Sequence, residues 1–294
     1  MKATLHPASY FSLVSEQLVR CELCPRRCVI SSGESGFCQV RFNRDGKLYS
    51  SVYGFPAAVQ IDPIEKKPIS YWKSGTKTFS LGTFGCNFTC LYCQNDSLSR
   101  VSSDPLRKTK YVEPEEIVRL AKRYSCESIA FTYNEPTVFF EYALEIAKLA
   151  KAAGLATVLV SNGWINPEPR AELYQYIDAA NIDLKAFSED FYSKLCGGSL
   201  AEVLKSCKHL RFVSKSHLEI TNLVIPGYND KKEQVTELLQ WVADELGTDT
   251  PLHFSAYFPA AGFTALATKA STLYEIREMA SNLGFNKVKL GNLR

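Results

Sequence analysis

The segment TFSLGTFGCNFTCLYCQN, residues 78–95, decides the fold because it joins a strand-like run directly to a loop with three cysteines. Residues 78–84 have the β-branched and aromatic composition of a strand. Cys86, Cys90 and Cys93 then follow within eight positions, and the run offers no fourth ligand. The next cysteine, Cys126, has no cysteine or histidine partner at ligand spacing. The loop therefore predicts a metal site with one open coordination position.

From residue 78 onward, short β-branched or aromatic runs alternate with longer helical patterns. Such alternation implies a parallel sheet with helical crossovers. Six or seven units favour an α/β fold, a partial (β/α)6 TIM-like barrel, with its site at the C-terminal ends of the strands. Strands are predicted at 78–84, 128–133, 155–162, 181–187, 217–225, 251–258 and 286–290, and helices at 113–124, 139–153, 168–177, 232–246 and 271–283.

The first 75 residues differ from this pattern. We predict an N-terminal cysteine-rich extension over residues 1–75 and the barrel over residues 76–294. The extension is expected to contain one helical stretch, a cysteine-rich loop and a hairpin over residues 39–54, whose turn is Asp45-Gly46.

Composition places the chain among ordinary globular proteins, with 294 residues, 46% hydrophobic and 22% charged. The net charge of +3 is too small to indicate a nucleic acid or an anionic membrane as partner. No segment reaches the length of a membrane span, and the N-terminus lacks the apolar run of a signal peptide. We expect a cytoplasmic protein, in which ten cysteines indicate metal or redox chemistry rather than disulfides.

Three thiolates suit two kinds of metal centre. Catalytic zinc uses three protein ligands and one open position, although three thiolates from one short loop would be unusual. Iron–sulfur cubes normally take four thiolates, so three leave one iron free to bind a substrate or cofactor. Cysteines that only fill a core usually have apolar neighbours, whereas here Gly85, Asn87 and Asn95 flank the thiols.

The spacing Cys-x-x-x-Cys-x-aromatic-Cys, formed by Cys86, Cys90, Tyr92 and Cys93, resembles the signature of the radical S-adenosylmethionine (SAM) superfamily. The resemblance implies a [4Fe-4S] cluster whose fourth iron binds the amino and carboxylate groups of SAM. One electron, from a ferredoxin- or flavodoxin-type reductant protein, would cleave SAM to a 5′-deoxyadenosyl radical that takes hydrogen from the substrate. It also implies that Tyr92 lies near the adenine. No further catalytic residue is predicted.

The motif FTYNEPT follows the second strand, where that superfamily meets the SAM ammonium. Asn134 and Glu135 supply the amide and carboxylate oxygens that an ammonium requires. Taken alone, Asn-Glu-Pro is also a helix-start signal. Its position beside the cysteine loop favours the SAM contact.

The third and fourth strands end in SNG and DLK, which resemble the corresponding motifs of glycyl-radical-enzyme activases. The resemblance implies SAM contacts from Ser161, Asn162, Asp183 and Lys185, with the aspartate on the ribose side and the lysine on the carboxylate. Asp183 and Lys185 are two apart on a strand and hence share a face. The alternative is a buried salt bridge to a neighbouring strand.

The fifth strand ends in VIPGYND, which resembles the Val-Pro-Gly turn that approaches the adenosine through its backbone. Gly227 would permit this approach. A plain strand-to-helix turn capped by Asn229 or Asp230 is an equal alternative. His253 and Cys196 have no predicted role in the site. We expect His253 to be a core histidine whose hydrogen bonds are satisfied, and Cys196 to be packed or to face the barrel mouth.

Four more cysteines, Cys21, Cys24, Cys28 and Cys38, lie within 18 residues of the extension. Four thiols suit a closed zinc site or a second iron–sulfur cluster. A redox pair is less well supported because no thioredoxin-like βαβ unit surrounds it. The alternative that these thiols bind nothing conflicts with their turn-rich, charged neighbourhood.

Together with YNEPT, SNGW, IDLKAF, LEITNLVIPGYND and HFSAYFP, this stretch resembles the radical SAM enzymes of the AmmeMemoRadiSam group, which are similar to pyruvate formate-lyase-activating enzyme. The resemblance covers residues 20–292. We therefore predict a radical SAM enzyme of unknown substrate. Two alternatives are a glycyl-radical activase acting on a partner protein's glycine and a non-catalytic zinc-binding interaction module.

Overall fold

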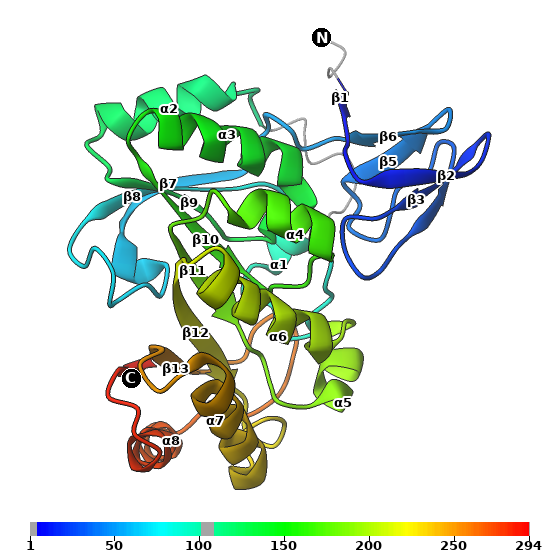
Figure 1. The fold of residues 1–294 in the computed structure, drawn as a ribbon. Helices are drawn as coiled ribbons and strands as arrows, with labels where there is room; N and C mark the ends of the chain where they lie inside the picture. The colour runs from blue at the N-terminus through cyan, green and yellow to red at the C-terminus, as the bar shows by residue number, and fades with distance from the viewer. Residues whose placement is uncertain (1–4, 101–108, 294) are drawn as a thin grey trace.

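A curved eight-stranded sheet forms the centre of the molecule in the computed structural model, which describes residues 5–100 and 109–293 (Figure 1). Seven of its strands, from β8 to β14, are parallel in sequence order, and β7 pairs antiparallel with β8 at one edge. The strands are β7 (Ala58–Pro63), β8 (Lys77–Gly82), β9 (Ser128–Phe131), β10 (Ala156–Ser161), β11 (Ala179–Asp183), β12 (His217–Val224), β13 (Leu252–Ala256) and β14 (Val288–Gly291).

Helices connect successive strands and lie along one face of the sheet (Figure 1). The strands between them are buried on both faces, as all four residues of β9 show. This arrangement confirms the predicted α/β fold with a partial TIM-like barrel. The helices are α1 (Asp96–Ser99), α2 (Pro114–Arg123), α3 (Phe140–Ala152), α4 (Pro167–Tyr174), α5 (Glu189–Phe191), α6 (Leu200–Lys208), α7 (Lys232–Leu246) and α8 (Ala270–Asn282), with short helices η1 (Ile64–Lys66), η3 (Pro136–Phe139), η4 (Tyr192–Cys196) and η5 (His209–Val213).

The inner face of the sheet is filled by the connection between β7 and β8. Ile64 and Ile69 from this connection are fully buried against Ala130, Val158 and Ala179 of three adjacent strands. The two alanines leave space that the isoleucine side chains occupy, which keeps the interior closely packed. The connection therefore acts as a plug that closes the interior of the partial barrel.

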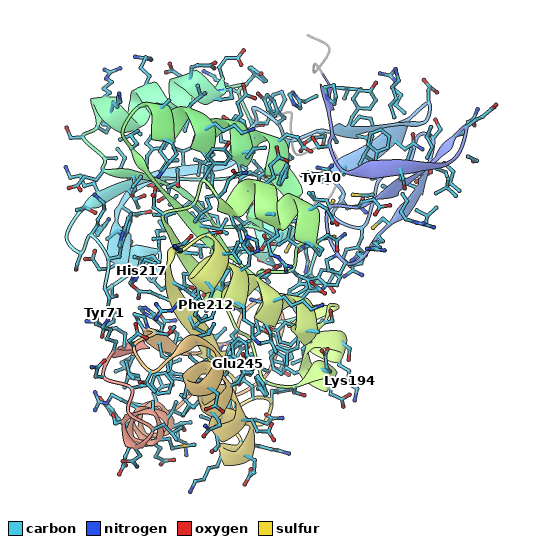
Figure 2. All side chains as sticks on the ribbon, viewed as in Figure 1. Tyr10, Tyr71, Lys194, Phe212, His217 and Glu245 are labelled. Carbon is cyan, nitrogen blue, oxygen red and sulfur yellow. The ribbon has the colours of Figure 1, made fainter. Side chains whose placement is uncertain are left out.

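A buried carboxylate on β12 fixes this plug. Glu219 is fully buried and accepts hydrogen bonds from the backbone amides of Ser70 (2.9 Å) and Tyr71 (2.8 Å). It also hydrogen-bonds to the rings of His217, which is labelled in Figure 2, and of His253. His253 is thus the satisfied core histidine that the sequence predicts. Burial alone would raise the pKa of Glu219, but these hydrogen bonds lower it to about 2.

The extension consists of two small antiparallel sheets. One contains β1 (His6–Pro7), β5 (Arg41–Arg44) and β6 (Lys47–Ser50); the other contains β2 (Phe11–Ser15), β3 (Leu18–Cys21) and β4 (Val29–Ser31). The predicted hairpin is confirmed, because Asp45 and Gly46 join β5 to β6 with φ of 51° and 75°.

The prediction of a helical stretch in the extension is wrong. Among residues 5–75, the only helix is the single turn η1. Phe11 pairs with Cys21 and Leu13 with Val19 across the β2–β3 hairpin, so the apolar residues recur with period two.

A buried ion pair attaches the extension to the barrel. Arg41 of β5 contacts Glu141 of α3 at 2.9 Å, and both side chains are almost fully buried. Tyr10, between the two parts in Figure 2, donates a hydrogen bond to Glu172 of α4 at 2.6 Å.

The two-domain division stays a prediction, and β7, which precedes residue 75, pairs within the barrel sheet. In the ranges that the structure describes, no helix combines the length and apolar character needed to cross a bilayer.

Acid should weaken the plug. The pKa of Glu219 is lowered to about 2 in the folded chain, so its contribution is complete above its ordinary value of 4.5 and is lost as the pH falls through the folded pKa. The difference corresponds to about 3 kcal/mol. We expect Glu219→Gln to lower the free energy of unfolding at pH 7 and to flatten its dependence on pH below 5. Urea unfolding at several pH values measures both effects; unchanged stability in the variant would contradict this role.

Candidate active site

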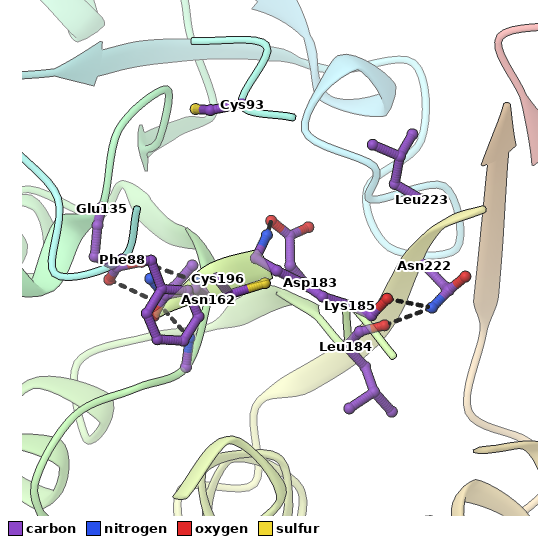
Figure 3. Close-up of polar contacts among 12 residues, drawn as sticks. Phe88, Cys93, Glu135, Asn162, Asp183, Leu184, Lys185, Cys196, Asn222 and Leu223 are labelled. Atoms are coloured by element: carbon purple, nitrogen blue, oxygen red, sulfur yellow. Dashed lines mark hydrogen bonds and ion pairs between the residues drawn. The ribbon is translucent and has the colours of Figure 1, made fainter. Parts of the chain in front are cut away.

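A cavity of about 430 Å³ opens at the C-terminal edge of the parallel strands. Every strand from β8 to β14, or the loop that follows it, contributes to its wall, and Figure 3 shows several of these residues. Most predicted site residues line it together: Cys86, Cys90, Tyr92, Cys93, Asn134, Glu135, Ser161, Asn162, Asp183 and Lys185. A volume in this range suits a small-molecule ligand of cofactor size.

The cysteine loop after β8 is anchored by the side chain of Asn134. Its oxygen accepts a hydrogen bond from the Thr83 amide at 2.9 Å, and its nitrogen donates to the Gly85 carbonyl at 2.9 Å. These buried backbone groups lie outside the sheet ladder and need such a partner. Asn134 therefore positions the start of the loop. Because its side-chain oxygen and nitrogen both already form hydrogen bonds, the side chain has little remaining capacity to bind a ligand.

A second set of hydrogen bonds ties the loop to the end of β10. The Asn162 side chain donates to Asn87 Oδ1 at 2.8 Å, and Asn87 donates to the Trp164 carbonyl at 2.8 Å. The Trp164 amide in turn donates to Asn162 Oδ1 at 2.9 Å. Asn87 was only a polar neighbour of the cysteines in the sequence; the structure shows that it links two strand ends.

Glu135 is a buried carboxylate that borders the cavity. It accepts hydrogen bonds from the hydroxyl groups of Thr137 (2.7 Å) and Ser161 (2.8 Å) and from the Asn162 amide (2.8 Å; Figure 3). Burial nonetheless raises its pKa above the ordinary value. Within residues 5–100 and 109–293, no basic side chain forms an ion pair with it. A cationic ligand group at this wall would supply the missing charge.

Asp183 and Lys185 share a face at the end of β11, as the sequence predicts. Lys185 Nζ lies 3.0 Å from Asp183 Oδ2, so the pair is formed within one strand end (Figure 3). Burial lowers the pKa of Lys185, but the neighbouring groups Asp183, Cys90 and Cys196 together raise it well above its ordinary value, which keeps the ammonium charged. The pair thus presents both an acceptor and a donor to the cavity.

Two asparagines that the sequence did not assign a SAM role hold this strand end in place. Asn222 donates to the carbonyls of Leu184 (2.7 Å) and Lys185 (3.2 Å; Figure 3), and Asn229 donates to the Lys185 carbonyl at 2.7 Å.

Gly227 lies outside the residues that line the cavity, and its amide donates to Asp230 at 2.7 Å. Asp230 thus closes the turn that precedes α7, as in the alternative interpretation, but neither it nor Asn229 caps the helix, whose N-cap is Lys231.

Tyr92 and Cys196 pack beside the second cysteine of the loop. The Tyr92 hydroxyl lies 3.3 Å from Cys196 Sγ, and Tyr92 is buried. A hydrogen bond with Cys196, and then burial, raise the pKa of the Cys90 thiol well above its usual range. Burial also raises the pKa of Cys86. Thiolates at these positions therefore require a cation, which a metal centre supplies.

Lys67 and Tyr133, which sequence reasoning missed, also line the cavity. Lys67, a buried residue of the plug, contacts Asp62 at 2.7 Å, and the Tyr133 hydroxyl donates to the same carboxylate at 3.1 Å. Tyr133 has a φ of 72°, a backbone conformation that L residues rarely adopt. Asp62 and Lys67 lie in the predicted extension, where no motif indicated a contact with the barrel.

The three loop thiols fit a metal centre in number and in ligand chemistry, and all three line the same cavity. Among the described residues, no three Cys, His, Asp or Glu side chains already form an ion-binding set. All ten cysteines are free, so none is committed to a disulfide.

Comparison with known proteins agrees with this site. The family model of the radical SAM superfamily matches residues 80–241, which contain the cysteine loop and the ends of β8 to β12. An uncharacterised protein of Methanocaldococcus jannaschii is 40% identical over 98% of this chain and 86% of its own length. The chain belongs to the radical SAM superfamily and is an enzyme, so the alternative of a non-catalytic zinc-binding module does not hold.

Other relatives are more distant. A pyruvate formate-lyase-activating enzyme of Staphylococcus epidermidis is 27% identical over 56% of this chain and 68% of its own. A radical SAM methyltransferase from Sphaerobacter thermophilus matches in fold with a TM-score of 0.58, at 11% identity, over 97% of this chain and 76% of that one. Streptococcus suis SuiB bound to S-adenosylmethionine matches with a TM-score of 0.56, at 15% identity, over 73% and 50% of the two chains.

Proposed function

We propose that this enzyme binds a [4Fe-4S] cluster through Cys86, Cys90 and Cys93 and holds SAM in the adjoining cavity. Bound together, these groups would supply reductive cleavage of SAM to a 5′-deoxyadenosyl radical, which takes a hydrogen atom from the substrate. Three thiols leave one iron without a protein ligand, and family membership supports both cofactors. The residues of the chain would position and orient the cluster and SAM and would balance their charges.

The observation that carries this proposal is the buried Glu135 carboxylate on the cavity wall. It lacks a cationic partner in the described part of the chain, and the three thiols border the same cavity. SAM carries an ammonium group that would complete the charge pair. Ser161 and Asn162 hold the carboxylate in place from β10, and Asn134 holds the cysteine loop above it.

The remaining polar groups would receive the rest of SAM. Asp183 offers carboxylate oxygens suited to ribose hydroxyls, and Lys185 offers an ammonium suited to the SAM carboxylate. Tyr92 lines the cavity and would pack near the adenine. Gly227 is the weakest member of this proposal because its turn lies outside the cavity wall.

A glycyl-radical activase acting on a protein partner is the second candidate. Sequence similarity to pyruvate formate-lyase-activating enzyme and to a putative glycyl-radical enzyme activating enzyme of M. jannaschii, 29% identical over 52% of this chain, favours it. A probable GTP 3′,8-cyclase of Thermoplasma volcanium is also similar, at 23% identity over 54%. Relatives named for such different reactions leave the substrate class open.

The electron would come from a reductant protein of ferredoxin or flavodoxin type. Ten free thiols and a cluster exposed to oxidation suit a reducing compartment, so we place the enzyme in the cytoplasm. No nucleic acid is proposed as partner, since the net charge is only +3.

The central test is production of 5′-deoxyadenosine. The protein is purified without oxygen, reduced and mixed with SAM, and the product is measured by chromatography beside a Cys90→Ala variant. We expect product from the native enzyme and a loss of at least about a hundredfold in the variant, because the cluster loses one of its three thiolates. Cys126→Ala, a buried cysteine outside the cavity, serves as the control and should retain activity. Equal product from native protein and Cys90→Ala would exclude the proposed site.

SAM binding should depend on Lys185. We expect Lys185→Met to raise the dissociation constant of SAM about tenfold or more, because a charge-assisted hydrogen bond contributes roughly 1.5–3 kcal/mol. Anaerobic equilibrium dialysis with the cluster-loaded enzyme measures this constant. Lys194→Met, which removes an exposed lysine on η4 paired with Asp190, is the matched control and should leave it unchanged. Unaltered affinity in Lys185→Met at equal iron content would remove Lys185 from the SAM site.

A further inference from the structure

The four cysteines of the extension surround a second, much smaller cavity. Its volume is about 20 Å³, and Cys21, Cys24, Cys28 and Cys38 all line it. Cys21 ends β3, Cys24 and Cys28 lie in the turn that leads to β4, and Cys38 precedes β5. Residues up to 17 positions apart in the chain thus line one small cavity, although no three metal-ligating side chains of the described residues already stand at ion-binding distances. The radical chemistry proposed above uses none of these thiols.

The backbone around these thiols forms a tight knuckle. The Cys21 amide donates to the Cys28 carbonyl at 2.9 Å, and the Arg27 amide donates to the Cys24 carbonyl at 3.1 Å. Arg27 has a φ of 46°, which turns the chain sharply between Cys24 and Cys28. The Phe37 amide points at Cys28 Sγ at 3.5 Å, and an amide hydrogen bond of this kind stabilises a metal-bound thiolate.

The charges at the cavity wall suit an anionic centre. Arg26 and Arg41 both line it. Arg41 is paired with Glu141, whereas Arg26 contacts only backbone carbonyls and aromatic rings and forms no ion pair within the described residues. Four thiolates with one divalent cation carry a net charge of −2, which the free guanidinium of Arg26 would partly balance.

The size of the cavity favours the smaller of the two metal centres left open by the sequence. About 20 Å³ accommodates roughly one water-sized body. That space suits a single ion, whereas an iron–sulfur cube of eight atoms would have to force the walls apart. Zinc takes four thiolates in a closed tetrahedral site and adds stability to small folds with little core.

The knuckle also touches the cysteine loop of the active site. Arg26, between Cys24 and Cys28, donates to the Asn87 carbonyl at 2.9 Å and also to the Gly197 carbonyl. Gly85 has a φ of 88°, and a side chain there would lie 2.5 Å from the Cys38 carbonyl. The backbone at residues 85–87 is therefore packed directly against the knuckle, and Asn87 itself lines the smaller cavity.

We propose that Cys21, Cys24, Cys28 and Cys38 bind one zinc ion, and that this closed site positions residues 85–87 of the active-site loop through Arg26 and the Cys38 carbonyl. The zinc site stands independently of the proposed function. The positioning role rests on that function, since its readout is the cluster bound by the loop.

Metal analysis of protein purified without oxygen tests the zinc site. We expect one zinc per chain in addition to the iron, and loss of that zinc in Cys24→Ser, while the control Cys126→Ser retains it. If Cys24→Ser does not fold, the native protein is titrated with a mercurial reagent in the presence of a zinc-binding dye, and one zinc should be released. Absence of zinc from the native protein, or about four irons lost with Cys24→Ser, would overturn the proposal, the latter in favour of a second cluster.

Arg26 variants test the positioning role. Arg26→Met should retain zinc but alter the electron paramagnetic resonance spectrum of the reduced cluster, because the Asn87 carbonyl of the loop loses the hydrogen bond from Arg26. Arg26→Lys should restore the spectrum in part. An unchanged spectrum in Arg26→Met would refute the positioning role. If the native protein held zinc but no cluster, the proposed function would fail while the zinc site stood.

Discussion

The active site depends on one constraint: the cysteine loop has little regular structure, so its backbone must find hydrogen-bond partners on neighbouring segments. Asn134 from the end of β9 satisfies Thr83 and Gly85, and Asn162 from the end of β10 holds Asn87. Buried backbone groups without partners are rare because each carries a substantial desolvation cost. The same asparagines therefore fix the position of three thiols relative to the strand ends that would bind SAM.

The packed interior of the barrel supports the position of the active site. The plug from residues 64 to 71 fills the inner face of the sheet, and Glu219 holds its backbone from β12. Because the interior beneath is packed, the cavity forms only at the C-terminal edge, where side chains from successive strands meet. Lys67 continues from this plug into the cavity wall, so the stability of the plug and the shape of the site are connected.

The sequence predicted the parts of the structure that depend on local patterns. Alternating strands and helices from residue 78, the Asp45-Gly46 turn and the shared face of Asp183 and Lys185 follow from chain periodicity or turn chemistry. The β2–β3 hairpin was missed because its strands have only five and four residues, so their alternation of apolar residues is too brief to distinguish a strand from a helix. The contacts of Asn87, Asn222 and Glu219 were also missed, since each joins segments far apart in the chain, and no single-sequence pattern records such a contact.

The proposed function requires direct contact between SAM and an iron of a cluster held by Cys86, Cys90 and Cys93. Electron–nuclear double resonance on the reduced enzyme, with SAM carrying ¹⁵N in its amino group and ¹⁷O in its carboxylate, measures this contact. We predict hyperfine coupling from both labels in the native enzyme. A cluster signal that shows no coupling to either label, or native protein that forms no cluster, would contradict the account.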